Sequence, residues 1–137
     1  MSIEIVNAEY EAMSRQDWPA VFRDAHDDFE FEPPSTGLGS GPTRGREPAR
    51  KDIREFFAPY EEIVLDPQEF REAGDLIAVD LVVRTRPHGS SKMIEIRVGQ
   101  LWTLREGRLA RLQVFPQRES AFEAVEALEA AGRESVS

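Results

Sequence analysis

A carboxylate at Glu32 and an amide at Gln100 are the side chains in this sequence that are best placed to do chemistry. Glu32 ends the segment 28–32, in which polar and aromatic residues alternate, and prolines follow it directly. A carboxylate held beside aromatic rings can take a proton as a general base, so Glu32 is the candidate catalytic residue. A second interpretation stays open, because a strand that buries Phe29 and Phe31 on one face turns Glu32 toward solvent on the other.

Gln100 interrupts a row of apolar residues on one expected strand face, with Val98 before it and Trp102 after it. A buried amide needs hydrogen-bond partners, which the protein or a ligand supplies. Glutamine donates hydrogen bonds but does not transfer protons, so we expect Gln100 to bind or polarise a ligand oxygen. The alternative is a core amide that is bonded to the backbone or to a neighbouring strand.

Further aromatic and apolar residues are candidates for the wall of a small-molecule pocket, since such pockets are lined mainly by side chains of these types. Tyr10 would add a phenol from the first helix, although a tyrosine on an apolar stripe is commonly a core residue. The candidate ligand-binding residues are Tyr10, Trp18, His26, Phe56, Tyr60, Val98, Gln100, Trp102, Leu112 and Val114. His26 and His88 are too far apart in the sequence for a convincing metal site, so we expect no metal and no cofactor.

The elements that must position these side chains follow from hydrophobic periodicity and from the distribution of glycine and proline. The sequence predicts helices over residues 3–16, 18–25, 48–57 and 118–131, strands over 28–32, 64–72, 76–86, 92–105 and 108–115, and a glycine- and proline-rich loop over 33–47. A tight hairpin turn is expected at Glu106 and Gly107. Helices that come first and a long antiparallel meander that follows predict an α+β domain.

Alternation along the last three strands assigns the side chains to two faces of the sheet. The inward face is expected to carry Ile77, Val79, Leu81, Val83, Ile94, Ile96, Val98, Gln100, Trp102, Leu104, Ala110, Leu112 and Val114. The opposite face is expected to carry Asp80, Arg84, Glu95, Arg97, Thr103, Arg111 and Gln113. We interpret the charged face as a solvated or dimer-facing surface with cross-strand ion pairs.

Composition narrows the class of protein. A chain of 137 residues with 40% hydrophobic and 31% charged residues suits one domain, expected over residues 1–131, with a disordered tail over 132–137. The net charge of −9 argues against a nucleic-acid partner, because phosphate contacts need clustered Lys and Arg. The sequence shows neither a signal peptide nor an apolar stretch long enough to cross a membrane, so no membrane partner is expected and the cytoplasm is the expected location.

Three parts of the chain, in this order and spacing, resemble the SnoaL-like branch of the nuclear transport factor 2-like superfamily. They are residues 15–31, residues 44–57, and residues 101–108 with Arg118, Glu119 and the closing helix. The resemblance implies a cone-shaped α+β barrel, in which a curved, mixed, mostly antiparallel sheet is wrapped around N-terminal helices. It also implies an apolar pocket at the open end of the cone and a homodimer.

The resemblance does not imply one activity, because this fold hosts ketosteroid isomerases, polyketide cyclases, epoxide hydrolases, dehydratases and members with no known reaction. In isomerase-like members the base is an aspartate directly before a proline, and Glu32 before Pro33 is similar. By position, Gln100 resembles the place where the isomerases hold a protonated aspartate. We favour a protein that binds a small apolar molecule in its cone, with no defined reaction.

The alternative function is a cofactor-independent isomerase, cyclase or lyase that acts on a polyketide-like or steroid-like substrate. In that case Glu32 would be the base, and Gln100 or Tyr10 would polarise the developing oxyanion. A third possibility is a dimeric interaction module that has no ligand.

Overall fold

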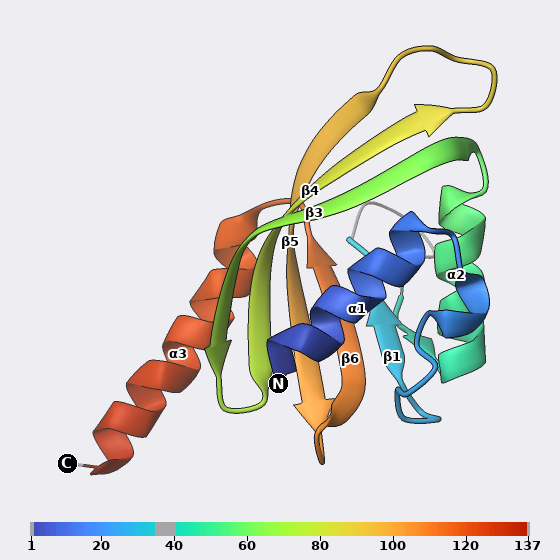
Figure 1. Ribbon diagram of the computed structural model, residues 1–137. Helices are drawn as coiled ribbons and strands as arrows, with labels where there is room; N and C mark the ends of the chain where they lie inside the picture. Colours follow the sequence, from blue (N-terminus) through green and yellow to red (C-terminus); the bar gives the residue numbers. More distant parts are fainter. Residues whose placement is uncertain (1, 35–40, 137) are drawn as a thin grey trace.

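One curved sheet holds the other elements in place. The computed structural model describes residues 2–34 and 41–136, and in this part of the chain the sheet has six strands in the order β2-β1-β6-β5-β4-β3 (Figure 1). The strands are β1 Glu30–Glu32, β2 Thr43–Arg44, β3 Tyr60–Ala73, β4 Leu76–Pro87, β5 Ile94–Arg105 and β6 Arg108–Phe115. Neighbouring strands pair antiparallel except β1 and β6, which pair parallel. The predicted α+β class with a mixed, mostly antiparallel sheet is therefore confirmed.

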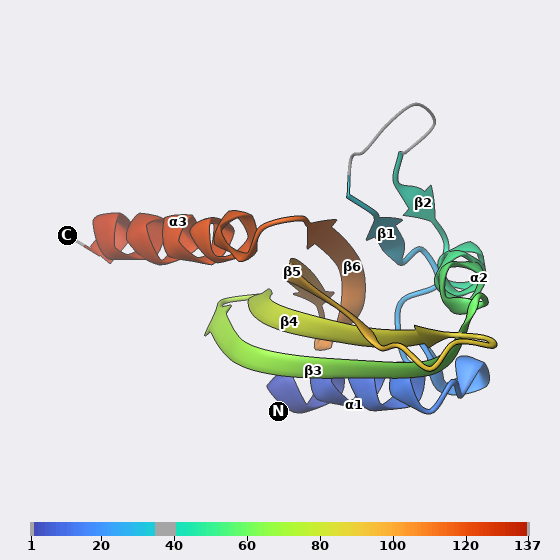
Figure 2. The same cartoon turned by 90° about the horizontal axis from the view of Figure 1, so that it is seen from above.

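The helices lie on both faces of this sheet. They are α1 Ser2–Ser14, the short 3-10 helix η1 Trp18–Ala20, α2 Arg46–Phe57 and α3 Arg118–Val136. Figure 2 shows α1 along β3 on one side of the sheet, α3 on the other side, and α2 beside β1 and β2. Among the described residues, no helix is long and apolar enough to cross a membrane.

Two predicted helix boundaries differ from the structure. Helix α2 begins at Arg46 rather than at Pro48, because Gly45 adopts a φ of +110°, which ends β2 and turns the chain directly into the helix. Helix α3 continues beyond Ala131 to Val136. The tail predicted for residues 132–137 is thus helical through Val136, and Ser137 lies outside the described residues.

The helix predicted over residues 18–25 is wrong, because only its first turn forms, as η1. Phe22 follows with a φ of +60°, in the left-handed region that an α-helix cannot contain. The backbone N–H of Phe22 donates a 2.8 Å hydrogen bond to Oε1 of Glu9 on α1 instead of bonding within a helix.

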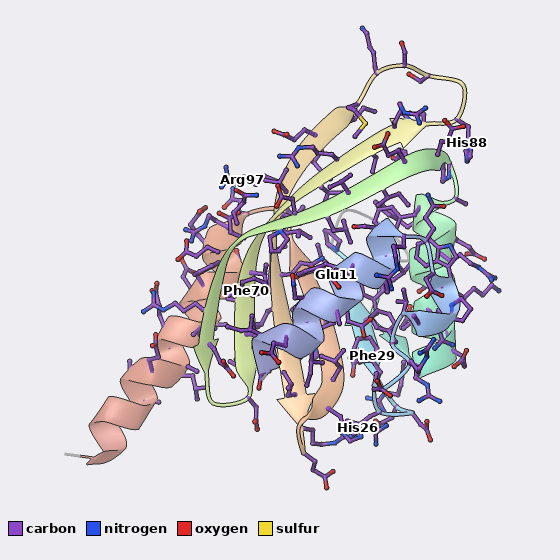
Figure 3. The ribbon with its side chains drawn as sticks, viewed as in Figure 1. Glu11, His26, Phe29, Phe70, His88 and Arg97 are labelled. Carbon is purple, nitrogen blue, oxygen red and sulfur yellow. The ribbon has the colours of Figure 1, made fainter. Side chains whose placement is uncertain are left out.

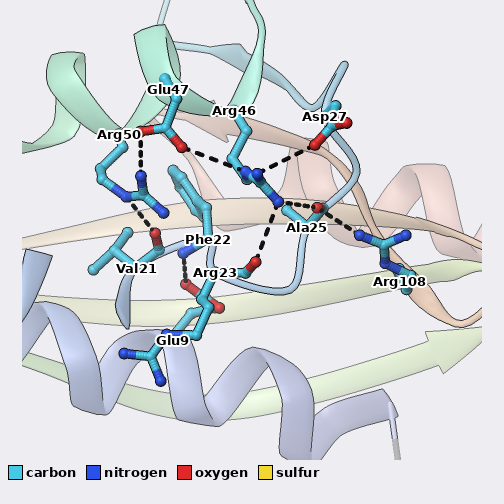
Figure 4. A network of polar contacts seen from close by, with 10 residues as sticks. All are labelled: Glu9, Val21, Phe22, Arg23, Ala25, Asp27, Arg46, Glu47, Arg50 and Arg108. Carbon is cyan, nitrogen blue, oxygen red and sulfur yellow. Dashed lines mark hydrogen bonds and ion pairs between the residues drawn. The ribbon is translucent and has the colours of Figure 1, made fainter. Parts of the chain in front are cut away.

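Arginine side chains donate hydrogen bonds to backbone carbonyl groups of this segment (Figure 4). Nε of Arg50 donates to the carbonyl of Val21 at 2.8 Å. Nη1 of Arg46 and Nη2 of Arg108 both donate to the carbonyl of Ala25, at 3.2 Å and 3.0 Å. These arginines belong to α2 and β6, so distant parts of the chain determine the conformation of this segment.

Two apolar clusters occupy the two faces of the sheet. On the inner face, buried residues of α1 and α2 pack on β4, β5 and β6, and the largest fully buried side chains include Trp102, Tyr10, Phe22 and Phe29. On the outer face, a smaller cluster beneath α3 consists of Ala78, Leu101, Ala121, Phe122 and Val125. The strand alternation therefore separates two layers of packing.

One predicted inward residue, Ala110, is wrong because the pairing of β5 with β6 contains a bulge. Thr103 pairs with Arg111, but Leu104 pairs with Leu109, so Ala110 has no partner on β5. Leu109 is 1% exposed and belongs to the inner core in place of Ala110. The loop predicted over 33–47 is also interrupted, by β2, and its residues 35–40 lie outside the described residues.

The outer face holds α3 through a buried carboxylate and a close backbone contact. Asp80 on β4 is 4% exposed and accepts hydrogen bonds from Nε and Nη2 of Arg97, both at 3.0 Å, while Nε of Arg118 lies 3.2 Å away. Hydrogen bonding from Arg97, with the charge of Arg118, lowers the pKa of Asp80. Gly99 lies against the first residues of α3, where an added Cβ would be 2.7 Å from Cα of Arg118.

Candidate functional site

The inner face of the sheet contains a cavity of about 520 Å³ beside α2. Side chains of α2 and of strands β1, β3, β4, β5 and β6 form its wall, together with the prolines that follow β1. The lining residues are Phe31, Pro33, Pro34, Asp52, Ile53, Glu55, Phe56, Phe57, Leu65, Leu81, Val83, Ile96, Val98, Gln100 and Val114. The wall is mainly apolar, which is typical of a site for a small organic molecule.

Strand register accounts for the sheet side of this cavity. Leu81 of β4 pairs with Val98 of β5, and Gln100 of β5 pairs with Val114 of β6. Side chains of directly paired residues point to the same face of a sheet, so these residues form one continuous surface.

The cavity has an open side. Phe56 of α2 and Ile96 of β5 both line it, yet they are 61% and 48% exposed. Ile94 lies two positions before Ile96 on the same strand face and is also exposed. Large apolar side chains of both α2 and β5 are thus left exposed at this cavity, where a ligand can contact them.

A chain of hydrogen bonds orients the amide of Gln100. Nε1 of Trp102 donates to the hydroxyl of Tyr10 at 2.9 Å, and this hydroxyl donates to Oε1 of Gln100 at 2.7 Å. The tyrosine oxygen accepts from the indole, so its proton is available for the glutamine oxygen. The Nε2 group of Gln100 donates to no described residue, although Gln100 lines the cavity. The arrangement presents amide N–H donors to the cavity.

Tyr10 orients this amide and does not exchange protons. Its side chain is 1% exposed, and burial raises the pKa of the Tyr10 phenol well above its ordinary range. The indole of Trp102, whose ring meets that of Tyr10 edge to face, lowers this pKa by a smaller amount. The phenol is therefore a neutral donor at every working pH.

A carboxylate that the sequence analysis missed, Asp52 of α2, lines the same cavity. The hydroxyl of Thr43 on β2 donates to Oδ2 of Asp52 at 2.5 Å. Charge-assisted bonds of this kind are short and fix the orientation of the carboxylate. Residues three and four apart share one face of a helix, so Glu55 and Phe56 accompany Asp52 on the cavity side of α2.

Glu32, the predicted base, lies on the outer face of the sheet. Its Oε2 accepts hydrogen bonds from Nη2 of Arg111 at 2.6 Å and from Nε2 of Gln113 at 3.0 Å. The parallel register of β1 with β6 pairs Glu32 with Gln113 and Phe31 with Leu112, so Phe31 faces inward and Glu32 faces outward. Glu32 is not among the described residues that line the cavity. The Glu32 assignment is therefore corrected, because strand alternation turns the carboxylate away.

The other predicted site residues divide into four groups. Phe56, Val98, Gln100 and Val114 line the cavity. Tyr10, Trp102 and Leu112 are fully buried behind this wall, where Tyr10 and Trp102 support Gln100. Trp18 and Tyr60 contact the ring of the lining residue Phe57 from outside, at centroid distances of 6.2 Å and 6.4 Å.

The fourth group is His26, which has a structural contact and is not among the described residues that line the cavity. Its Nε2 lies 2.6 Å from the carbonyl oxygen of Arg105, and a carbonyl only accepts, so Nε2 carries the proton. Figure 3 shows His26 and His88 at opposite ends of the molecule. Among the described residues, no group of three or more His, Asp or Glu is arranged to hold a metal ion.

Glu9 is a second buried carboxyl group, located away from the cavity. It is 8% exposed, and burial raises its pKa from 4.5 to about 7, with a smaller raising effect from the charge of Asp24. The N–H of Phe22 and the charge of Arg50 lower the pKa of Glu9, but by less than burial raises it. Glu9 therefore titrates near neutral pH while it holds the backbone of the next segment.

Comparison with known protein families gives one match that spans most of the chain. Residues 6–112 match the model of the SnoaL-like domain. No curated protein matches the chain in sequence.

Solved structures with the same fold extend over nearly the whole chain. An NTF2-like protein of unknown function from Burkholderia pseudomallei has a TM-score of 0.72 and 23% identity, over 90% of this chain and 96% of that one. TerC, co-crystallised with polyporic acid, has a TM-score of 0.70 and 23% identity over the same shares. IdmH, a putative polyketide cyclase from Streptomyces antibioticus, has a TM-score of 0.69 and 20% identity, over 83% of this chain and 90% of that one. At these identities the likeness shows the fold alone.

Proposed function

Given that this chain belongs to the SnoaL-like domain family, we propose that it binds a small apolar molecule in its inner cavity and that an oxygen atom of this molecule accepts a hydrogen bond from Gln100. The observation that carries the proposal is the orientation of the Gln100 amide, whose oxygen is engaged by Tyr10 and whose nitrogen donates to no described residue. An amide N–H group that lines a cavity and lacks a protein acceptor can donate to an oxygen atom of a ligand bound there.

The size and chemistry of the cavity support an organic ligand. A volume of about 520 Å³ lies within the usual range for small-molecule sites. Leu81, Val83, Val98 and Val114 offer aliphatic contact, and Phe57 offers an aromatic wall. A ligand with a largely apolar body and one carbonyl or carboxyl oxygen would match this surface, and the oxygen would be directed at Gln100.

Structural neighbours are consistent with a ligand of this class. TerC was crystallised with polyporic acid, and IdmH is described as a putative polyketide cyclase. The transfer of a polyketide-like ligand to this chain is part of our proposal. We include in it a homodimer, which the family resemblance implies, and a cytoplasmic location, which is the expectation from the sequence.

Native mass spectrometry of the purified protein is the first test. A homodimer mass with an additional small molecule would support the proposal and identify the ligand class. The second test compares two probes, 2-tetralone and tetralin, which differ by one carbonyl oxygen. We expect the protein to bind 2-tetralone more tightly by about 5- to 10-fold, since one hydrogen bond contributes about 1 kcal/mol.

Matched glutamine variants decide whether Gln100 is responsible. Gln100→Met keeps the length of the side chain but removes the N–H donors, so the preference for 2-tetralone should disappear. Gln113→Met is the control, because Gln113 lies on the outer face and donates to Glu32. Equal affinities of the unchanged protein for 2-tetralone and tetralin would contradict the proposal.

A second candidate function is a cofactor-independent isomerase, cyclase or lyase. Glu32, the base that the sequence predicts for this function, is bonded to Arg111 and is not among the described residues that line the cavity. Asp52 lines the cavity together with Gln100. A carboxylate and an amide donor on one cavity form a pair that acid-base chemistry on a carbonyl compound can use.

A further inference from the structure

We propose that Asp52 is a catalytic residue, the base that removes a proton from the carbon next to the ligand carbonyl, and that Thr43 is its positioning residue. This inference rests on the proposed function, because it places the carbonyl oxygen at the Gln100 amide. It assigns the proton transfer to a residue on α2, whereas the sequence places the base at the end of β1.

A comparison of the ionisable residues that line the cavity supports this assignment. Of the described residues that line it, only Asp52 and Glu55 have ionisable side chains. Glu55 is exposed, and water solvates a carboxylate at that position. Asp52 is half-buried and is bonded to Thr43, so its carboxylate is held in one orientation. A base that acts on a bound ligand must have such a fixed position.

Asp52 and Gln100 line the same cavity from different elements. The carboxylate belongs to α2, which lies beside β1 and β2, and the amide belongs to β5. Thr43 occupies one oxygen of Asp52, and no described residue donates to the other, Oδ1. A ligand in the cavity would therefore meet an acceptor from α2 and a donor from β5.

The proposed step is balanced and needs no oxidant or reductant. Asp52 takes a proton from the carbon beside the carbonyl, the electron pair of the broken C–H bond forms the new carbon–carbon double bond, and the carbonyl π pair moves to oxygen. The N–H of Gln100 stabilises the enolate that results. Asp52, now a carboxylic acid, returns the proton to the same carbon or to a conjugated one. The net reaction is hydrogen exchange at that carbon in the first case and the shift of a double bond in the second.

Exchange of protons for deuterium in 2-tetralone provides the test. In D₂O, removal and return of a proton beside the carbonyl replaces hydrogen with deuterium, which proton NMR follows directly. The protein should accelerate this exchange over buffer by roughly 100-fold or more, the usual contribution of a positioned general base. Asp52→Asn should reduce the acceleration by a similar factor, and Asp52→Glu should restore part of it. Thr43→Val should reduce it by about 10-fold, since the base is retained but less well held.

Saturation-transfer NMR on the same samples reports binding separately from exchange. Bound 2-tetralone without accelerated exchange would overturn the assignment of Asp52 and leave the proposed function standing. Absence of binding would contradict the proposed function and this inference together. Thermal unfolding of each variant confirms that it is folded.

Glu32→Gln distinguishes between the two carboxylates. Glu32 is paired with Arg111 on the outer face, so this variant should exchange 2-tetralone at the unchanged rate. A loss of exchange in Glu32→Gln, with full exchange in Asp52→Asn, would overturn the proposal in favour of the base predicted from sequence.

Discussion

The hydroxyl of Tyr10 donates a 2.7 Å hydrogen bond to Oε1 of Gln100, which joins α1 to the middle of the sheet over a sequence separation of 90 residues. The same hydroxyl accepts from Trp102. One buried phenol therefore satisfies two polar groups and leaves the amide nitrogen of Gln100 for the cavity. The first helix contributes to the site through orientation, although Tyr10 itself does not line the cavity.

Replacement of Tyr10 by Phe should lower the free energy of unfolding by about 1–3 kcal/mol, because it leaves the indole N–H of Trp102 and Oε1 of Gln100 without their buried partner. Urea unfolding measures the change. Tyr60→Phe is the matched control, since the Tyr60 hydroxyl has no hydrogen bond with the described residues and its loss should change stability by less than about 0.5 kcal/mol. Equal effects of the two substitutions would show that the hydrogen bonds of the Tyr10 hydroxyl do not stabilise the fold.

Glu9 should make stability decrease as the pH rises through neutrality. Its pKa is about 7 in the folded protein and 4.5 ordinarily, so the folded state holds the proton more tightly. The stabilisation is fully present below pH 4.5 and is lost as the pH rises to about 7, by about 3 kcal/mol in total. Urea midpoints at pH 5 and pH 8 should differ in the unchanged protein, and the difference should be smaller in Glu9→Gln. The same pH dependence in both proteins would exclude Glu9 as its source.

Gly99→Ala should destabilise the protein by about 1–3 kcal/mol, as overpacking commonly does. The added Cβ would lie 2.7 Å from Cα of Arg118 and 2.8 Å from the carbonyl oxygen of Gln117, and these backbone atoms cannot move without displacing the start of α3. Chemical unfolding checks the value. Gly41→Ala is the control, because nothing lies within 4 Å of a Cβ built there. An unchanged free energy of unfolding in Gly99→Ala would mean that α3 is free to shift on the sheet.

Asp80→Asn should lower the free energy of unfolding by about 2 kcal/mol at pH 7, because it removes the buried charge that Arg97 and Arg118 share. Because hydrogen bonding to Arg97 lowers the pKa of Asp80, its stabilisation is present above pH 4 and is lost as the pH falls through the lowered value. The effect of the substitution should therefore shrink in acid. Asp28→Asn breaks an exposed pair with Arg105 and should have little effect at either pH. Unfolding curves at pH 7 and at about pH 2, below the ordinary pKa of an aspartate, compare the two.

Strand alternation predicted the sheet side of the site correctly because side chains on a strand repeat every two residues. The face that carries Val98, Gln100 and Val114 follows directly from this period. The same rule was wrong at Ala110, because a bulge adds a residue that no period in the sequence reveals. The same alternation gives the observed orientation of Glu32, since burial of Phe31 requires Glu32 to point outward.

Contacts between distant segments account for the remaining differences. The segment 21–25 has the composition of a short helix, but Arg46, Arg50 and Arg108 bind its carbonyl groups. Asp52 could not be identified from the sequence, because its position in the cavity wall depends on how α2 packs in the folded protein. Its spacing from Phe56, four positions on one helix face, was the available signal.

The parallel pairing of β1 with β6 affects how the protein is made. Strand β1 has only the short β2 beside it until β6, which ends at Phe115, has been synthesised. During translation, Phe31 of β1 therefore lacks its final packing until almost the entire chain has been synthesised. Phe31 and Val114 face the same cavity, so a nascent chain has no ligand site until its last strand is in place. Ligand binding thus reports completed synthesis, and we expect a chain truncated before β6 to remain aggregation-prone whether or not the ligand is present.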